Sequence, residues 1–129
     1  MKLLLDSHIL VWMAAMTARL PEEARLLIEE PANNIFFSSV SIWELTVKHT
    51  IDKDDIPVHP SVLYRALIEN DLKEIQVTGM HGLGVGSLPM IHKDPFDRLL
   101  VAQCISEGMI LLTSDKMLAR YDAPIRLVR

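Results

Sequence analysis

The sequence has few of the features that mark a secreted or membrane-embedded protein. Its single cysteine, Cys104, cannot form an internal disulfide or a cysteine-rich zinc site. The N-terminus reaches Asp6 after only three leucines, a run too short for a signal peptide or a membrane span. We therefore expect a soluble, cytoplasmic protein with no membrane contact, in which Cys104 is a small buried hydrophobe of an apolar run.

Basic residues and nucleotide-binding motifs are also scarce. Lysine and arginine number 13 against 17 acidic residues, so the formal net charge is −4. A protein that holds nucleic acid by its own field is usually basic. No Walker A motif occurs, and the spacing of Gly82, Gly84 and Gly86 does not match a dinucleotide fingerprint. A function on nucleic acid would therefore need metal ions or a local basic patch to offset the acidic groups.

Apolar residues, by contrast, are abundant and evenly spread. They make up 50% of the 129 residues, enough for a core without disulfides or a structural metal. No linker, repeat or low-complexity tract interrupts the chain, so residues 1–129 form one predicted domain.

Short apolar runs alternate with helical patterns along this domain. We predict strands at residues 2–6, 35–38, 74–77, 109–113 and 125–128. We predict helices at residues 8–16, 21–30, 41–50, 61–70, 95–107 and 115–120, with only a weak or irregular helix at the glycine-rich residues 79–86. This alternation indicates an α/β fold with three layers, in which helices cover both faces of a mostly parallel sheet of four to five strands.

Four acidic residues fall at strand-to-helix or loop-to-helix edges of this pattern. They are Asp6, Glu44, Asp97 and Asp115. Ligands of open α/β sheets bind beyond the carboxyl ends of the strands, and right-handed crossovers can bring these edges to one rim.

Each acid alone has a simpler interpretation as a helix cap. Asp6, Asp94 and Asp115 fit N-cap positions, and Asp97 follows Asp94 in the first turn. Glu44 completes the pattern of a capping box that opens at Ser41. Together, converging carboxylates would raise one another's pKa unless a cation intervenes, and their oxygens suit Mg²⁺ or Mn²⁺. Such a site can activate water for attack on a phosphodiester.

Four segments in the right order resemble PIN-domain toxins of the VapC type. They are residues 4–12, 38–45, 88–103 and 111–115, of which residues 88–103, with Asp94-Pro95-Phe96-Asp97, are the most specific. The resemblance spans nearly the whole chain. It implies a PIN-like fold and a Mg²⁺- or Mn²⁺-dependent endoribonuclease.

The resemblance also assigns roles to individual residues and suggests partners. It matches Asp6, Glu44, Asp97 and Asp115 to the metal-binding quartet, with Asp6 and Asp97 first as direct ligands. Glu44 and Asp115 would bind a second ion or position water. Asp94 belongs to the same motif, and Ser7 and Thr113 match positions that support the site by hydrogen bonding. Partners implied by the resemblance are RNA, a cognate antitoxin protein and a second copy in a homodimer.

The remaining polar and aromatic candidates have mostly structural interpretations. Arg98 is predicted either to bridge or pair with the carboxylates or to contact substrate. Lys48 and Lys116 are candidate phosphate contacts, and His92 is predicted to be an exposed loop residue beside the acidic helix start. Trp12 and Trp43 are read as core or partner-groove residues.

Two alternative functions stay open from the sequence. One is a catalytically silent PIN-like module that binds a partner, although a silent scaffold has no reason to keep four clustered charges. The other is a different Mg²⁺ phosphotransfer enzyme. Phosphatases with an aspartyl nucleophile generally carry a second aspartate two residues later, and here that position is His8.

Overall fold

A single five-stranded parallel sheet organises the protein. The computed structural model describes all residues, 1–129. The strands are β1 Lys2–Leu5, β2 Asn34–Ser38, β3 Lys73–Ile75, β4 Ile110–Thr113 and β5 Ile125–Leu127. They lie in the order β3-β2-β1-β4-β5, and every neighbouring pair is parallel. The predicted sheet is thus confirmed, with β1 at its centre.

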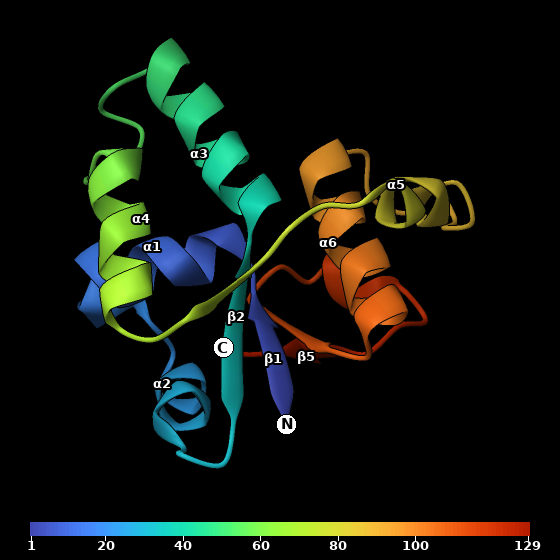
Figure 1. The fold of residues 1–129 in the computed structure, drawn as a ribbon, viewed down its shortest axis with the longest axis horizontal. Coiled ribbons are helices and arrows are strands. Elements are labelled where there is room, and N and C mark those ends of the chain that lie inside the picture. The colour runs from blue at the N-terminus through green and yellow to red at the C-terminus, as the bar shows by residue number, and fades with distance from the viewer.

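Helices cover both faces of this sheet. They are α1 Ser7–Ala15, α2 Glu22–Glu29, α3 Ser39–Ile51, α4 Pro60–Glu69, α5 Gly79–Val85 and α6 Pro95–Glu107, with short 3₁₀ turns at η1 Thr17–Arg19 and η2 Leu118–Arg120. Figure 1 shows α1, α2 and α4 on one side of β1 and β2, and α5 and α6 on the other. The three-layer α/β/α prediction is confirmed. None of these helices is both long and apolar enough to cross a bilayer.

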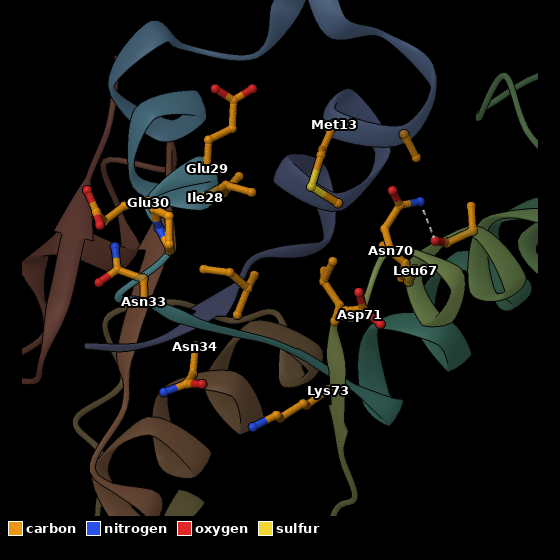
Figure 2. Close-up of a pocket in the computed structure, with 15 residues that line it drawn as sticks. Met13, Ile28, Glu29, Glu30, Asn33, Asn34, Leu67, Asn70, Asp71 and Lys73 are labelled. Atoms are coloured by element: carbon orange, nitrogen blue, oxygen red, sulfur yellow. Dashed lines mark hydrogen bonds between the residues drawn. The ribbon is translucent and has the colours of Figure 1, made fainter.

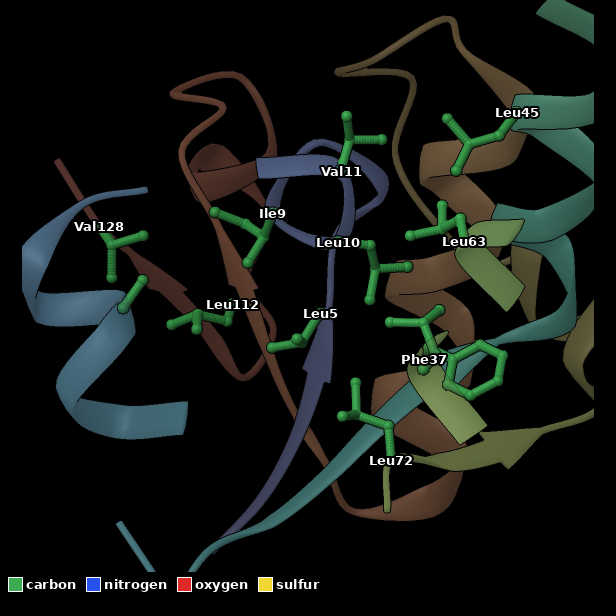
Figure 3. Close-up of a cluster of buried hydrophobic side chains, with 12 residues drawn as sticks. Leu5, Ile9, Leu10, Val11, Phe37, Leu45, Leu63, Leu72, Leu112 and Val128 are labelled. Atoms are coloured by element: carbon green, nitrogen blue, oxygen red, sulfur yellow. The ribbon is translucent and has the colours of Figure 1, made fainter. Parts of the chain in front are cut away.

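Alternating strand residues supply two separate cores. Leu5, Phe37 and Leu112 face α1 and α4 in the first core, which Figure 3 shows in close-up. Leu4 and Leu111, adjacent to these in sequence, belong to the second core beneath α6. Successive side chains of a strand point to opposite faces of the sheet. Because helices cover both faces, Leu4 and Leu5 are both buried, each in a different core, and so are Leu111 and Leu112. Cys104 lies fully buried in the second core, as predicted.

The start of α3 differs from the predicted capping box. The helix begins at Ser39, directly after β2, and the Ser38 side chain accepts a hydrogen bond from the Val40 backbone N–H. Glu44 therefore lies in the second turn and caps nothing, and the Ser41 hydroxyl is buried without a partner. The prediction failed because Ser38 ends a strand and caps the following helix at once.

The glycine-rich segment also differs from its prediction, since residues 79–85 form a regular helix, α5. A capping box holds its start: His81 N–H donates to Thr78 Oγ1, and the Thr78 N–H donates to His81 Nδ1. The buried His81 ring also reaches Glu107 of α6 at 2.8 Å. A capped start and packing on α6 offset the low helix propensity of glycine.

Candidate metal centre

The four predicted acids approach one rim at the carboxyl ends of the strands. Asp6 directly follows β1, and Asp115 lies two residues beyond β4. Glu44 is in the second turn of α3, which follows β2, and Asp97 is in the first turn of α6. The negative charges of Asp6, Glu44 and Asp115 all act on Asp97, so the fold brings the four carboxyl groups together.

Asp97 has a strongly raised pKa. Burial, followed by repulsion from Asp6, Asp94, Glu44 and Asp115, raises its pKa to about 8. At neutral pH this carboxyl group therefore holds a proton in the absence of a cation. A perturbed acid surrounded by like charges is the electrostatic signature of a site that requires a counter-ion.

Asp6 and Asp115 are linked through one threonine hydroxyl. Thr113 Oγ1 donates to Asp6 Oδ2 at 2.6 Å and accepts from the Asp115 N–H at 3.0 Å. Burial raises the pKa of Asp6, and the bond from Thr113 partly opposes that rise. Asp115 Oδ1 accepts a hydrogen bond from the Met117 N–H in the turn after β4. Only Asp115 Oδ2 is left to face the other acids.

Glu44 has both of its carboxylate oxygens bound. Ser7 Oγ donates to Oε1 at 2.7 Å, and Lys48 Nζ lies 2.7 Å from Oε2. Burial lowers the pKa of Lys48, but the bond to Glu44 and the charges of Glu44, Asp94 and Asp97 raise it overall. Lys48 therefore stays cationic at this rim, where the sequence suggested a phosphate contact.

His92 joins the acids, contrary to the prediction of an exposed loop residue. Its Nε2 lies 3.1 Å from Asp115 Oδ2 and 3.2 Å from Asp97 Oδ2, and its side chain is 20% exposed. Ligand atoms of His92, Asp97 and Asp115 all lie within 4.8 Å of one another. The only sequence signal was that His92 lies five residues before Asp97, which does not say where the loop folds.

Asp94 caps a helix while its charge still acts on Asp97, and Arg98 turns away from the acids. Asp94 Oδ1 accepts from the Phe96 N–H and caps α6, as the simpler interpretation predicted. Arg98 is buried and makes no ion pair with an acid, so its predicted bridge to the carboxylates is wrong. Its guanidinium instead donates to the Pro89, Val85 and Leu88 carbonyls and to Tyr121 Oη. The end of α5 and the α5–α6 connection thus supply the backbone acceptors of this arginine.

We expect Arg98→Ala to lower the free energy of unfolding by about 3 kcal/mol, because it removes a buried side chain and the donors of three partly buried carbonyls. Urea unfolding followed by circular dichroism measures the change. Arg120→Ala removes an exposed arginine of η2 and should change stability by less than about 0.5 kcal/mol. Equal effects of the two variants would contradict the anchoring role of Arg98.

Hollows elsewhere on the surface do not contain the acids. A cavity of about 760 Å³ lies at the opposite, amino-terminal edge of the sheet, between α2 and the starts of β2 and β3 (Figure 2). A groove of about 1160 Å³ runs between α3 and α4. Trp43 borders this groove, is 61% exposed and contacts the Phe96 ring edge to face, so it lies outside the core. Trp12 is partly buried against the first core.

The donor chemistry fits a hard divalent cation. Aspartate and glutamate oxygens are the ligands that Mg²⁺ and Mn²⁺ prefer, and a bound cation would offset the repulsion that raises the pKa of Asp97. The carboxylates of Asp6, Asp97 and Asp115 could hold it. Glu44 is already bound to Ser7 and Lys48. It is therefore placed to orient these neighbouring side chains rather than to coordinate the cation.

Comparison with known proteins agrees with this architecture. The PIN domain model matches residues 3–124, so the chain belongs to the PIN domain family. Among characterised proteins, Ribonuclease VapC22 of Mycobacterium tuberculosis is 27% identical over 122 residues, which cover 94% of this chain and 92% of that protein.

Solved structures share the fold at low sequence identity. A VapBC2 complex of Rickettsia felis bound to a promoter DNA fragment superposes with a TM-score of 0.74 at 18% identity, over 100% of both chains. A toxin–antitoxin complex from Klebsiella pneumoniae gives 0.66 at 18% identity, over 95% of this chain and 94% of that one. DNA-bound VapBC from Salmonella typhimurium gives 0.65 at 16% identity, over 98% and 96%. These similarities confirm the PIN-like fold.

Proposed function

We propose that this protein is a Mg²⁺- or Mn²⁺-dependent endoribonuclease and the toxin of a toxin–antitoxin pair. The observation that carries the proposal is the convergence of Asp6, Glu44, Asp97 and Asp115 at one rim, with a pKa of about 8 at Asp97. A divalent cation at such a site supplies charge neutralisation and activates water for phosphodiester hydrolysis. The ribonuclease name of the VapC22 relative supports RNA as the substrate.

Hydrogen bonds within the site support an active centre over a silent binding module. Ser7 and Lys48 both hold Glu44, and Thr113 holds Asp6, so these two carboxyl groups have a defined orientation. Retaining several buried, mutually repelling carboxyl groups destabilises a fold that has no use for them. Preorganised charged groups of this kind are typical of catalytic sites.

The antitoxin partner is inferred from the neighbours and from the surface. Three structural neighbours are toxin–antitoxin complexes. The α3–α4 groove is bordered by exposed apolar side chains, among them Trp43 and Ile68, which a partner segment could cover. A homodimer follows from the family resemblance and is part of the same proposal.

The proposal is tested by incubating the protein with a panel of structured and unstructured RNAs. We expect cleavage with Mg²⁺ or Mn²⁺, its loss with a chelator, and its return when the cation is restored. Addition of the product of an adjacent small reading frame should inhibit it. Cleavage that persists in chelator would contradict metal dependence, and no cleavage of any RNA with either cation would favour the binding module.

A further inference from the structure

The connection between α5 and α6 places a histidine between two of the site's acids. His92 Nε2 lies 3.1 Å from Asp115 Oδ2 and 3.2 Å from Asp97 Oδ2. These acids belong to different elements, since Asp97 starts α6 and Asp115 follows β4. His92 therefore lies between two carboxyl groups that come from different parts of the fold.

The other ring nitrogen shows which atom carries the proton. The Asp94 backbone N–H donates to His92 Nδ1 at 3.1 Å. A nitrogen that accepts a hydrogen bond carries no proton, so the ring proton is on Nε2. Nε2–H then donates to Asp115 Oδ2, with Asp97 Oδ2 3.2 Å away.

We propose that His92 is a positioning residue: its Nε2–H donates to Asp115 Oδ2 beside Asp97, and the ring itself does not coordinate the cation. The inference rests on the proposed function and adds to it. The competing arrangement, with Nε2 as a metal ligand, needs a bare Nε2 and a protonated Nδ1. That proton would point at the Asp94 N–H, so two donors would face each other and a hydrogen bond would be lost.

The backbone around His92 is held in place by Tyr121 and by Arg98, the arginine that the sequence had placed near the acids. The His92 N–H donates to Tyr121 Oη at 2.9 Å, and the same oxygen accepts from Arg98 Nη1 at 3.2 Å. Arg98 also binds the Val85 carbonyl at the end of α5 and the Pro89 carbonyl of the connection. Arg98 and Tyr121 thus fix the loop that sets the ring against the carboxyl groups.

A site without a nitrogen ligand has a defined metal preference. Oxygen-only coordination accepts Mg²⁺ and Mn²⁺, whereas an imidazole ligand shifts preference toward Zn²⁺, Cu²⁺ and Ni²⁺. Hydrogen bonds to ligating carboxylates orient them, and loss of such partners typically lowers metal affinity about 10- to 100-fold.

The tautomer can be read directly on the unmodified protein. Two-bond ¹H–¹⁵N NMR of the full chain distinguishes protonated from bare ring nitrogens. We expect His92 Nε2 to be protonated both without cation and with saturating Mg²⁺. A bare Nε2 in either state overturns the proposal, and loss of its proton when Mg²⁺ is added would identify His92 as a ligand.

Two substitutions separate a donor from a ligand. We expect His92→Ala to weaken Mg²⁺ binding about 10-fold in calorimetry. His92→Gln, whose amide nitrogen can donate from a similar reach, should recover most of that affinity. An alanine variant that binds like wild type, or a glutamine variant no better than alanine, would overturn the positioning role.

The calorimetry also separates this inference from the proposed function. A wild-type protein that binds neither Mg²⁺ nor Mn²⁺ contradicts the metal-dependent function, and the role of His92 in cation binding fails with it. A wild-type protein that binds Mg²⁺ while Nε2 is bare overturns the His92 inference alone.

Discussion

Asp97→Asn is expected to lower metal-dependent RNA cleavage by at least about 100-fold. Asp97 lies where the charges of Asp6, Glu44 and Asp115 converge, and the amide that replaces it is a weaker ligand for a hard cation. A metal centre contributes several kcal/mol to transition-state stabilisation, and about 1.4 kcal/mol corresponds to a tenfold change in rate. Initial cleavage rates at saturating Mg²⁺ measure the effect.

A matched control separates the loss of this charge from loss of any charge. Glu30→Gln makes the same chemical change at the opposite edge of the sheet, beside the cavity of Figure 2. The glutamine keeps an oxygen for the bond that Glu30 accepts from the Ala32 N–H. The Glu30→Gln variant should cleave RNA at a rate within about twofold of wild type. If Asp97→Asn cleaves as fast as Glu30→Gln, Asp97 is not part of the metal site.

The cation-free protein is expected to lose stability as pH rises from about 4 to about 8. An unfolded aspartate titrates at about 3.9, whereas the pKa of Asp97 in the folded protein is about 8. Between these values the folded state binds more protons than the unfolded state, so the free energy of unfolding falls as pH rises. The raised pKa of Asp6 acts in the same direction.

Thermal unfolding in chelator at pH 5 and pH 8 tests this dependence. We expect the Tm to fall on the order of 5 °C between the two pH values in wild type. Asp97→Asn should show a much smaller fall, because its amide does not titrate. Saturating Mg²⁺ should also reduce the fall, since a cation that binds only the folded state stabilises it and favours ionised Asp97.

The Glu30→Gln variant should keep the wild-type dependence on pH, because its carboxyl group is exposed and far from the cluster. A Tm in chelator that rises between pH 5 and pH 8 would show that Asp97 ionises at its ordinary pKa. In that case the acids do not interact closely in solution, and the cation would have no repulsion to offset.

Most helices and strands could be predicted from local sequence patterns, because residues close together in the sequence determine where a helix or strand forms. The apolar runs at β1 and β4 are buried on both faces, and residue alternation assigns Leu4 and Leu5 to opposite cores. The Pro95 start and Gly108 end of α6 match the predicted boundaries, with Gly108 at a φ of +66°. The error at α5 arose where a distant partner overrode the local preference, since its His81 reaches Glu107.

The sequence by itself determined the α/β alternation and the position of the four acids at element edges. Those depend on periodicity and on capping, which act over a few residues. Only the tertiary structure decided what the acids contact. Glu44 binds Ser7 and Lys48, His92 reaches Asp97 and Asp115, and Arg98 turns to backbone carbonyls. Strand order and loop path set those contacts, and a residue's immediate neighbours in sequence carry no information about either.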